Sequence, residues 1–231
     1  MKKRLWLIIA LSVVAVSSAV TLVLVLNNRP PAGADGSTAS TQTPTLPPGG
    51  TVLAYSQFGR YSGAYVEDGS DDPVTDVAII LVKNPTSDFL EYARVEYDIG
   101  GQKAVFVVRG LPPGAAAWVL EASRLTIQPG SVFSLVDEVT SFGSPGIGSD
   151  GLKLTADAGV ITALNETEVN LHNVYIYYRQ CHTDGNFLGG ICYRVSLGML
   201  EPGKPVTVTA GHFDPENGKI VKITCEKESS L

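Results

Sequence analysis

Apolar and polar residues alternate in short stretches along most of this chain, and Gly, Pro, Asn or Asp separates the stretches every eight to twelve residues or so. A period of two is the pattern of a half-buried β-strand, because successive side chains of a strand point to opposite faces. Beyond residue 50 no stretch has the apolar period of an amphipathic helix. We therefore predict an all-β region, with the strongest strand signals at residues 77–83, 90–99, 104–109, 115–121, 160–164, 171–179, 191–197, 206–210 and 219–225.

Residues 5–26 break this alternation with a continuous apolar run that carries no charge. As a helix that rises ~1.5 Å per residue, the run reaches ~33 Å, which is enough to cross a bilayer. Residues 2–4 are basic and only Arg29 follows closely, so the excess of positive charge holds the stub 1–4 in the cytoplasm. We predict a single-pass transmembrane helix that anchors the chain in the lipid bilayer of the cell membrane, with the region after Asn27 extracytoplasmic.

A cleaved signal peptide is the alternative interpretation of this run. The small residues Ala32, Gly33 and Ala34 would suit a signal peptidase and would leave Asp35 as the mature N-terminus. The apolar stretch of a signal peptide runs roughly 7 to 15 residues, however, and the run here is longer. No Cys follows it, as a lipoprotein would require. We therefore expect the helix to be retained.

Residues 27–50 are rich in Pro, Gly, Ser and Thr and hold almost no apolar side chains. Such a segment cannot bury enough surface to offset the entropy lost on ordering, so we expect a linker that holds the following region off the membrane. Residues 51–231 contain 13 Lys and Arg against 22 Asp and Glu, a formal charge of −9. This balance disfavours nucleic acids and other polyanions as partners and leaves cationic or neutral ones.

The strand pattern repeats once along this acidic region. Placing Asn84 on Asn165 also superimposes further apolar positions, namely Leu90 on Leu171, Ala93 on Val174, Val95 on Ile176, Tyr97 on Tyr178, Phe106 on Val195 and Val108 on Leu197. The turn 111–114 then matches the turn 200–203, once eight extra residues are allowed at the tip of the second hairpin. Apolar positions, turn and insertion agree with one strand order, so we infer the duplication of a unit of about 85 residues.

This duplication predicts two tandem immunoglobulin-like β-sandwich units, at residues 51–147 and 148–231. The segment 139–151 is rich in Gly and Ser and is the expected boundary between them. One larger sandwich, to which both halves contribute strands around a shared core, is the alternative.

A resemblance to a known family rests on the same residues. Asn84, the strand LEYARVEYDIGG that follows it and the turn LPPG resemble bacterial envelope modules of the F-x-L-Y-D type. The strand LHNVYIYYR and the turn LEPG of the second unit are similar. The resemblance implies small immunoglobulin-like sandwiches that lie outside the membrane behind a lipoprotein or single-helix anchor. It implies no functional residue.

Motifs that carry chemistry are absent from the sequence: there is no serine nucleophile elbow, phosphate loop, zinc-protease helix or dinucleotide fingerprint. We therefore expect no catalytic residue, no metal and no cofactor. Two metal sites are weaker alternatives. The first is calcium on the acidic residues Glu67, Asp68, Asp71, Asp72 and Asp76, and the second is zinc on Cys181, His182, Cys192 and His212. Asn165 also begins an N-glycosylation sequon, Asn165-Glu166-Thr167.

Tyr175 and Tyr177 form a candidate contact face. Their apolar neighbours in the strand face the core by alternation, so both tyrosines lie together on the opposite face. Their counterparts in the repeat are the charged residues Arg94 and Glu96. An aromatic pair at positions that are charged in the first unit suits a covered face, with the neighbouring unit, a partner protein or a glycan as the cover.

Cys181 and Cys192 point to that same outer face, on two strands joined by the inserted hairpin 182–191. We predict a disulfide between them, which would close a loop of about 12 residues and add ~3 kcal/mol of stability. Cys225 alternates with apolar residues of the last strand and is expected to be a core thiol.

The register of the two strands decides whether this disulfide is easy to form. If Tyr178 opposes Val195, the two cysteines are direct neighbours with Cβ atoms ~5 Å apart. If Tyr178 opposes Tyr193, the Cβ atoms are ~7 Å apart and a bond requires the hairpin to bend.

The predicted function is a non-catalytic interaction or assembly module of the cell envelope, which binds an envelope protein or a glycan. One alternative is a glycan- or peptide-processing enzyme that uses loop carboxylates with His212 or His172. A second alternative is the ectodomain of a sensor. That sensor would act through a partner, because residues 1–4 leave no room for an output domain.

Overall fold

The computed structural model describes residues 51–146, 151–157 and 159–227, which form thirteen β-strands and no helix. The prediction of an all-β region is confirmed. The predicted cytoplasmic stub, membrane helix and linker, residues 1–50, lie outside the described residues. Within the described ranges no helix is long and apolar enough to cross a membrane.

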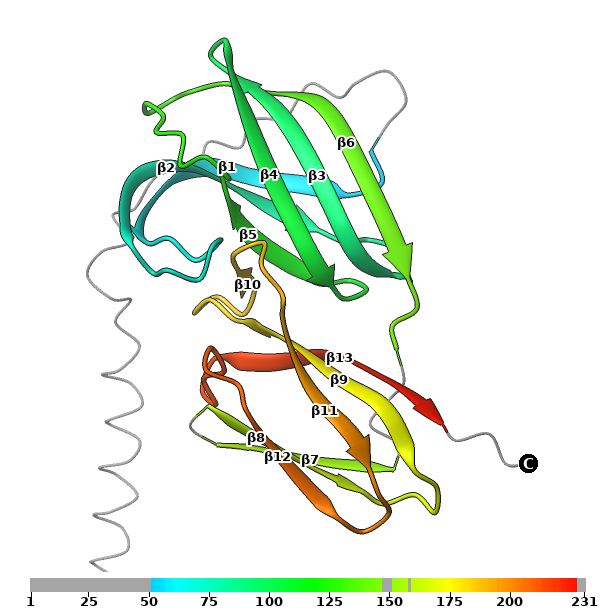
Figure 1. Ribbon diagram of the computed structural model, residues 1–231. Helices are drawn as coiled ribbons and strands as arrows, with labels where there is room; N and C mark the ends of the chain where they lie inside the picture. Colours follow the sequence, from blue (N-terminus) through cyan, green and yellow to red (C-terminus); the bar gives the residue numbers. More distant parts are fainter. Residues whose placement is uncertain (1–50, 147–150, 158, 228–231) are drawn as a thin grey trace, which may run out of the picture. The chain divides into compact units, whose positions relative to one another are not determined.

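Residues 51–146, the first half, supply most of two sheets. One sheet has the strand order β1-β2-β5-β10 and the other the order β4-β3-β6 (Figure 1). The strands are β1 (Ala54–Ala64), β2 (Pro73–Lys83), β3 (Phe89–Ile99), β4 (Gln102–Leu111), β5 (Ala116–Leu120), β6 (Phe133–Gly143) and β10 (Phe187–Leu188). Alternate apolar residues of both sheets, among them Ile80, Val95 and Phe106, meet in one hydrophobic cluster.

Residues 151–227, the second half, form two further sheets, with the orders β11-β9-β13 and β12-β8-β7. These strands are β7 (Leu152–Asp157), β8 (Val160–Asn165), β9 (Leu171–Gln180), β11 (Tyr193–Leu200), β12 (Pro205–Thr209) and β13 (Gly218–Lys227). A second hydrophobic cluster, which includes Ile161, Ile176 and Leu200, draws on both sheets.

All nine stretches that were predicted from alternation are strands, and β1, β6, β7 and β10 are additional. Strand β6 overlaps the expected boundary segment 139–151, which is therefore a strand as far as Gly143. The pattern of β6 was misleading because this strand pairs with β3 alone among the described strands and is largely exposed. A two-residue bulge at Val136 also shifts its alternation.

The two halves share the same hydrogen-bonded motif, at the end of β2 in the first half and at the end of β8 in the second. Asn84 and Asn165 are both fully buried. Each donates from its amide nitrogen to a backbone oxygen across the following turn, Asp88 O or Val169 O, and to the backbone oxygen at the end of a later strand, Leu111 O or Leu200 O. Each side-chain oxygen accepts hydrogen bonds from the N–H and the hydroxyl of a threonine two residues later, Thr86 or Thr167. The superposition of Asn84 on Asn165 thus holds at the level of single hydrogen bonds. Asn165 is also closed to glycosylation in the folded chain, because its amide is buried and bonded.

A short segment of the second half completes the first half. This segment is the insert, residues 182–191, which is the extra length in the second hairpin. Within it, β10 pairs in parallel with β5, and Phe187 joins the hydrophobic cluster of the first half. Gly189 N donates to Trp118 O of β5 at 2.8 Å, while Gly190 O accepts from Arg109 N of β4 at 2.7 Å. The insert therefore joins the open edges of the two sheets, and the described residues on both sides of 147–150 belong to one compact unit.

Gly190 is the position at which this joint tolerates no side chain. A Cβ atom there would lie 1.7 Å from Val107 O, so Gly190→Ala must push the insert away from β4. We expect a loss of at least about 2 kcal/mol in the free energy of unfolding, because backbone hydrogen bonds and the packing of Phe187 both suffer. Urea denaturation followed by tryptophan fluorescence measures it. The control is Gly211→Ala, where a Cβ atom meets nothing within 4 Å. Equal stability of the two variants would contradict the described contact.

Candidate functional site

The acidic loop, residues 65–72 between β1 and β2, lies against the insert. Its ends are joined by a hydrogen bond from Tyr65 N to Asp72 O at 2.8 Å. At its centre Glu67 accepts the N–H of Leu120 at 2.7 Å and the N–H of Gly190 at 2.6 Å, one on each carboxylate oxygen. One side chain thus holds the edge of β5 and the insert together. Burial, opposed by these hydrogen bonds, raises the pKa of Glu67 to about 7.

Arg179, at the end of β9, is a cation whose charge acts on this carboxylate and opposes the rise in its pKa. By alternation with Tyr175 and Tyr177 its side chain would point outward, yet it is fully buried, because the insert folds over it. Its guanidinium lies 5.1 Å from the ring centroid of Phe187 and donates to Arg109 O and Gly189 O. Burial lowers the pKa of Arg179. The charge of Arg179 is stabilised by these backbone carbonyls and, at longer range, by Glu67. Arg179 and Glu67 therefore both bind the backbone of the insert.

Two other carboxylates of the acidic loop, Asp68 and Asp72, turn toward an arginine. Arg124 stacks on the ring of Tyr65 at 4.4 Å and pairs with Asp68 at 2.8 Å and with Asp72 at 3.5 Å. Hydrogen bonds from Ser70, together with the Arg124 guanidinium, lower the pKa of Asp68 to about 2. Asp76 pairs instead with Arg60 of β1 at 2.7 Å. Of the five acidic residues considered for calcium, Asp68 and Asp72 share Arg124, Asp76 pairs with Arg60, and Glu67 binds backbone N–H groups. The described residues contain no group of three or more such side chains that could hold a metal ion.

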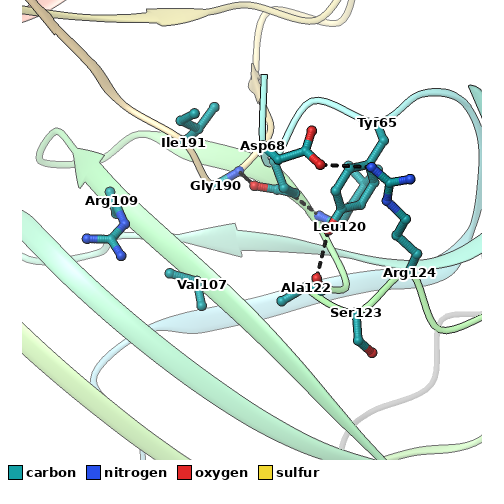
Figure 2. Close-up of a pocket in the computed structure, with 11 residues that line it drawn as sticks. Tyr65, Asp68, Val107, Arg109, Leu120, Ala122, Ser123, Arg124, Gly190 and Ile191 are labelled. Carbon is teal, nitrogen blue, oxygen red and sulfur yellow. Dashed lines mark hydrogen bonds and ion pairs between the residues drawn. The ribbon is translucent and has the colours of Figure 1, made fainter. Parts of the chain in front are cut away.

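A cavity of about 430 Å³, the Glu67 cavity, opens beside this loop. It is lined by Tyr65, Glu67, Val107, Leu120, Arg109 and Arg124, among others. Figure 2 shows the ion pair between Asp68 and Arg124 next to the ring of Tyr65. The hydroxyl of Tyr65 donates to Glu121 O and Ala122 O, and burial raises its pKa to about 12. Acids and bases are balanced in this cavity, and most of them are already paired.

A second cavity of about 390 Å³, the His212 cavity, lies on the other side of the loop and insert. Ile191 lines both cavities, while Asp71 of the acidic loop reaches only the second. His212 stacks on Tyr193 with ring centroids 4.5 Å apart, and Tyr193 stacks in turn on Tyr178 at 5.3 Å. Of the carboxylates and histidines weighed for catalysis, the structure thus brings together Asp71 and His212, whereas Glu67 belongs to the other cavity.

The residues proposed for zinc do not gather around one point. The Nδ1 atom of His182 lies 3.2 Å from Asp184 Oδ1 in the insert, while His212 is engaged with Tyr193. Cys192 lies against Gly110, and Cys181 packs against the hydrophobic cluster of the first half.

Tyr175 and Tyr177 lie on the outer face of β9, as predicted, and both are half-buried. Arg194 of the neighbouring β11 stacks over the ring of Tyr175 at 4.9 Å. Lys222 of β13 is the cross-strand partner of Tyr177 on the other side, and its ammonium lies 3.2 Å from Glu91 Oε1 of the first half. The first half therefore reaches one border of this face.

Both Cys181 and Cys192 are free thiols in the structure. The observed register places Tyr178 opposite Tyr193, which is the register in which a bond requires the hairpin to bend. Burial raises the pKa of both thiols, so they are poor nucleophiles for exchange. The disulfide stays a prediction for the protein in its own membrane. Cys225 packs against the hydrophobic cluster of the second half, as expected of a core thiol, whereas a bulge turns Val221 toward the first half.

Sequence reasoning did not find the contact of Glu67 with Gly190, which joins residues 123 positions apart. The available signal was the pair Gly189-Gly190 at the tip of an insertion, since adjacent glycines often mark a close approach of two backbones. A scan of protein-family models and searches of curated proteins and of solved structures find no match to this chain.

Glu67 makes the stability of the fold depend on pH. Its pKa rises from an ordinary 4.5 to about 7 on folding, so the folded protein binds more protons than the unfolded chain between these values. The contribution of Glu67 to stability is therefore fully present below pH 4.5 and is lost as the pH rises toward 7, by on the order of 3 kcal/mol. Residue 67 does not titrate in Glu67→Gln, so the free energy of unfolding of this variant depends less steeply on pH. Because Gln offers only one acceptor oxygen, the variant is also less stable at low pH, by about 1–2 kcal/mol.

Urea denaturation at a series of pH values from 4.5 to 7.5 measures the slope. Glu168→Gln is the matched control, because Glu168 is exposed on a turn of the second half. A wild-type slope in both variants would show that Glu67 is not the group that titrates.

Proposed function

We propose that this chain is a membrane-anchored, extracytoplasmic and non-catalytic interaction or assembly module of the cell envelope. Residues 5–26 anchor it in the lipid bilayer, residues 27–50 hold it off the surface, and the β region binds an envelope protein or a glycan. The composition of residues 5–26 and 27–50 supports the first two parts.

We further propose that the β region consists of two tandem immunoglobulin-like units, similar to envelope modules of the F-x-L-Y-D type. The support is the repeated motif at Asn84 and Asn165 and the presence of a separate large hydrophobic cluster in each half. The insert makes the pair a single body, because Phe187 belongs by sequence to the second unit and by packing to the first.

One observation carries the non-catalytic interpretation: the charged groups at the joint are used to hold backbone. Glu121, which is 1 % exposed, accepts the N–H groups of Val105, Ser123 and Leu125. Glu67 accepts the N–H groups of Leu120 and Gly190, and Arg179 donates to Gly189 O. Groups engaged in this way are poorly placed to exchange protons with a substrate, and they produce a rigid surface instead. A rigid, extended surface is what a binding module requires.

The predicted topology can be tested with protease added to spheroplasts. If residues 1–4 are cytoplasmic and the helix is retained, external protease removes the β region and leaves a small membrane-bound fragment. Detergent lysis before proteolysis serves as the control, since the fragment is then lost as well. A mature N-terminus at Asp35 would contradict a retained anchor.

The predicted contact face can be tested by photo-crosslinking in the native membrane. A photoreactive residue in place of Tyr177 should give a crosslinked product with a different envelope component, because half-buried aromatics on a sheet face suit such contacts. The same residue in place of Lys153, which is exposed on β7, should give none. No product at Tyr177, or the same product at both positions, would remove this face as the binding surface.

A further inference from the structure

The His212 cavity combines aromatic and acidic groups without a basic partner. The Tyr193 ring stacks on both Tyr178 and His212, at an interplanar angle of 15° for the latter pair. His212 itself is exposed, so its ring is accessible from solvent. Asp71 and Asp214 also line the cavity, and no Lys or Arg does.

The charge of this cavity differs from that of two other cavities. The Glu67 cavity contains both arginines and carboxylates, and a cavity of about 730 Å³ next to the insert contains Lys83 and Lys219 with no acid. Among the described residues neither Asp71 nor Asp214 forms an ion pair with a basic side chain. A cavity with two carboxylates and an accessible aromatic ring attracts cations.

The chain itself shows how such a group is bound. At the neighbouring Tyr65, Arg124 lies 4.4 Å above the ring and pairs with Asp68 at 2.8 Å. Ring, guanidinium and carboxylate form one unit there. The His212 cavity offers the ring and the carboxylates, and the cation has to come from elsewhere.

We propose that the His212 cavity receives an arginine side chain from a basic segment of a partner protein. The guanidinium stacks on the ring of His212 and forms a charge-assisted hydrogen bond with Asp71 or Asp214. Arginine suits the cavity better than lysine, because a planar guanidinium stacks on a ring and an ammonium does not. The formal charge of −9 on residues 51–231 accelerates the approach of such a segment. This inference rests on the proposed function and names the chemistry of the partner.

The test is a binding titration of the full-length protein in detergent at 0.15 M salt. The probe is a fluorescein-labelled peptide of alternating Gly and Arg, ten residues long. Matched peptides carry Lys or the neutral arginine analogue citrulline in place of Arg. We expect the Arg peptide to bind more tightly than the Lys peptide and the citrulline peptide to bind at least about tenfold more weakly than the Arg peptide. Equal binding of the Arg and citrulline peptides would overturn the proposal.

Variants locate the binding site. Asp71→Asn and Asp214→Asn each remove one carboxylate, and we expect at least one of them to raise the Kd of the Arg peptide about fivefold or more. Asp71 has φ +57°, a conformation that Asn tolerates, so this variant should fold, and its thermal melt verifies that. His212→Ala should weaken the Arg peptide more than the Lys peptide, because only the former loses stacking.

Asp157→Asn is the control for long-range charge, because Asp157 is exposed at the end of β7 and outside every cavity described above. It should change the Kd by less than about twofold. If it weakens binding as much as Asp71→Asn and Asp214→Asn do, attraction is general and the cavity is not the site. A failure here leaves the crosslink at Tyr177 intact, so the proposed function and this inference can fail separately.

Discussion

The approach of the insert to the two sheet edges is the contact on which the described structure depends. The first half has seven strands in its two sheets only because β10 comes from the second half. Edge strands β4 and β5 would otherwise present unpaired N–H and C=O groups beside an open core, and both are costly to leave unsatisfied. Residues 187–190 satisfy both edges at once, and the lack of a Cβ atom at Gly190 is what allows the backbones to meet.

Charged side chains hold this joint in place. Glu67 comes from the first half and Arg179 from the second, and both bind the backbone of the insert from opposite sides. Both charged groups are buried away from water, which is costly unless they are hydrogen-bonded. Each is therefore stable only while the backbone segments that it binds stay in place. The arrangement explains why a chain with separate hydrophobic clusters in its two halves forms one compact unit.

The two halves share one hydrogen-bonded motif but differ in the residues of their outer strand faces. Asn84 and Asn165 keep the same hydrogen bonds because each ties the end of one strand to the start of the next. On the outer face of the following strand, Arg94 and Glu96 of the first half pair with each other at 2.9 Å, whereas Tyr175 and Tyr177 occupy the same places in the second. The aromatic stack at His212 likewise has no equivalent among the ring contacts described for the first half, whose aromatic rings meet inside its hydrophobic cluster. The features on which the proposed binding rests therefore lie in the second half and in the acidic loop.

The all-β class, nine strands and the repeat could be predicted from the sequence, because alternation and turn residues are local properties and Asn84 recurs as Asn165 within the same pattern. Strand β6 could not, since an exposed edge strand has little alternation to detect, and β10 could not, since two residues have no period at all. Only the tertiary structure decided three features: Arg179 is buried, Asn165 is inaccessible to glycosylation, and Asp71 and His212 line one cavity. All three features depend on contacts with segments that are distant in the sequence. The register with Tyr178 opposite Tyr193 could not be predicted either, because it depends on how the insert packs on the first half.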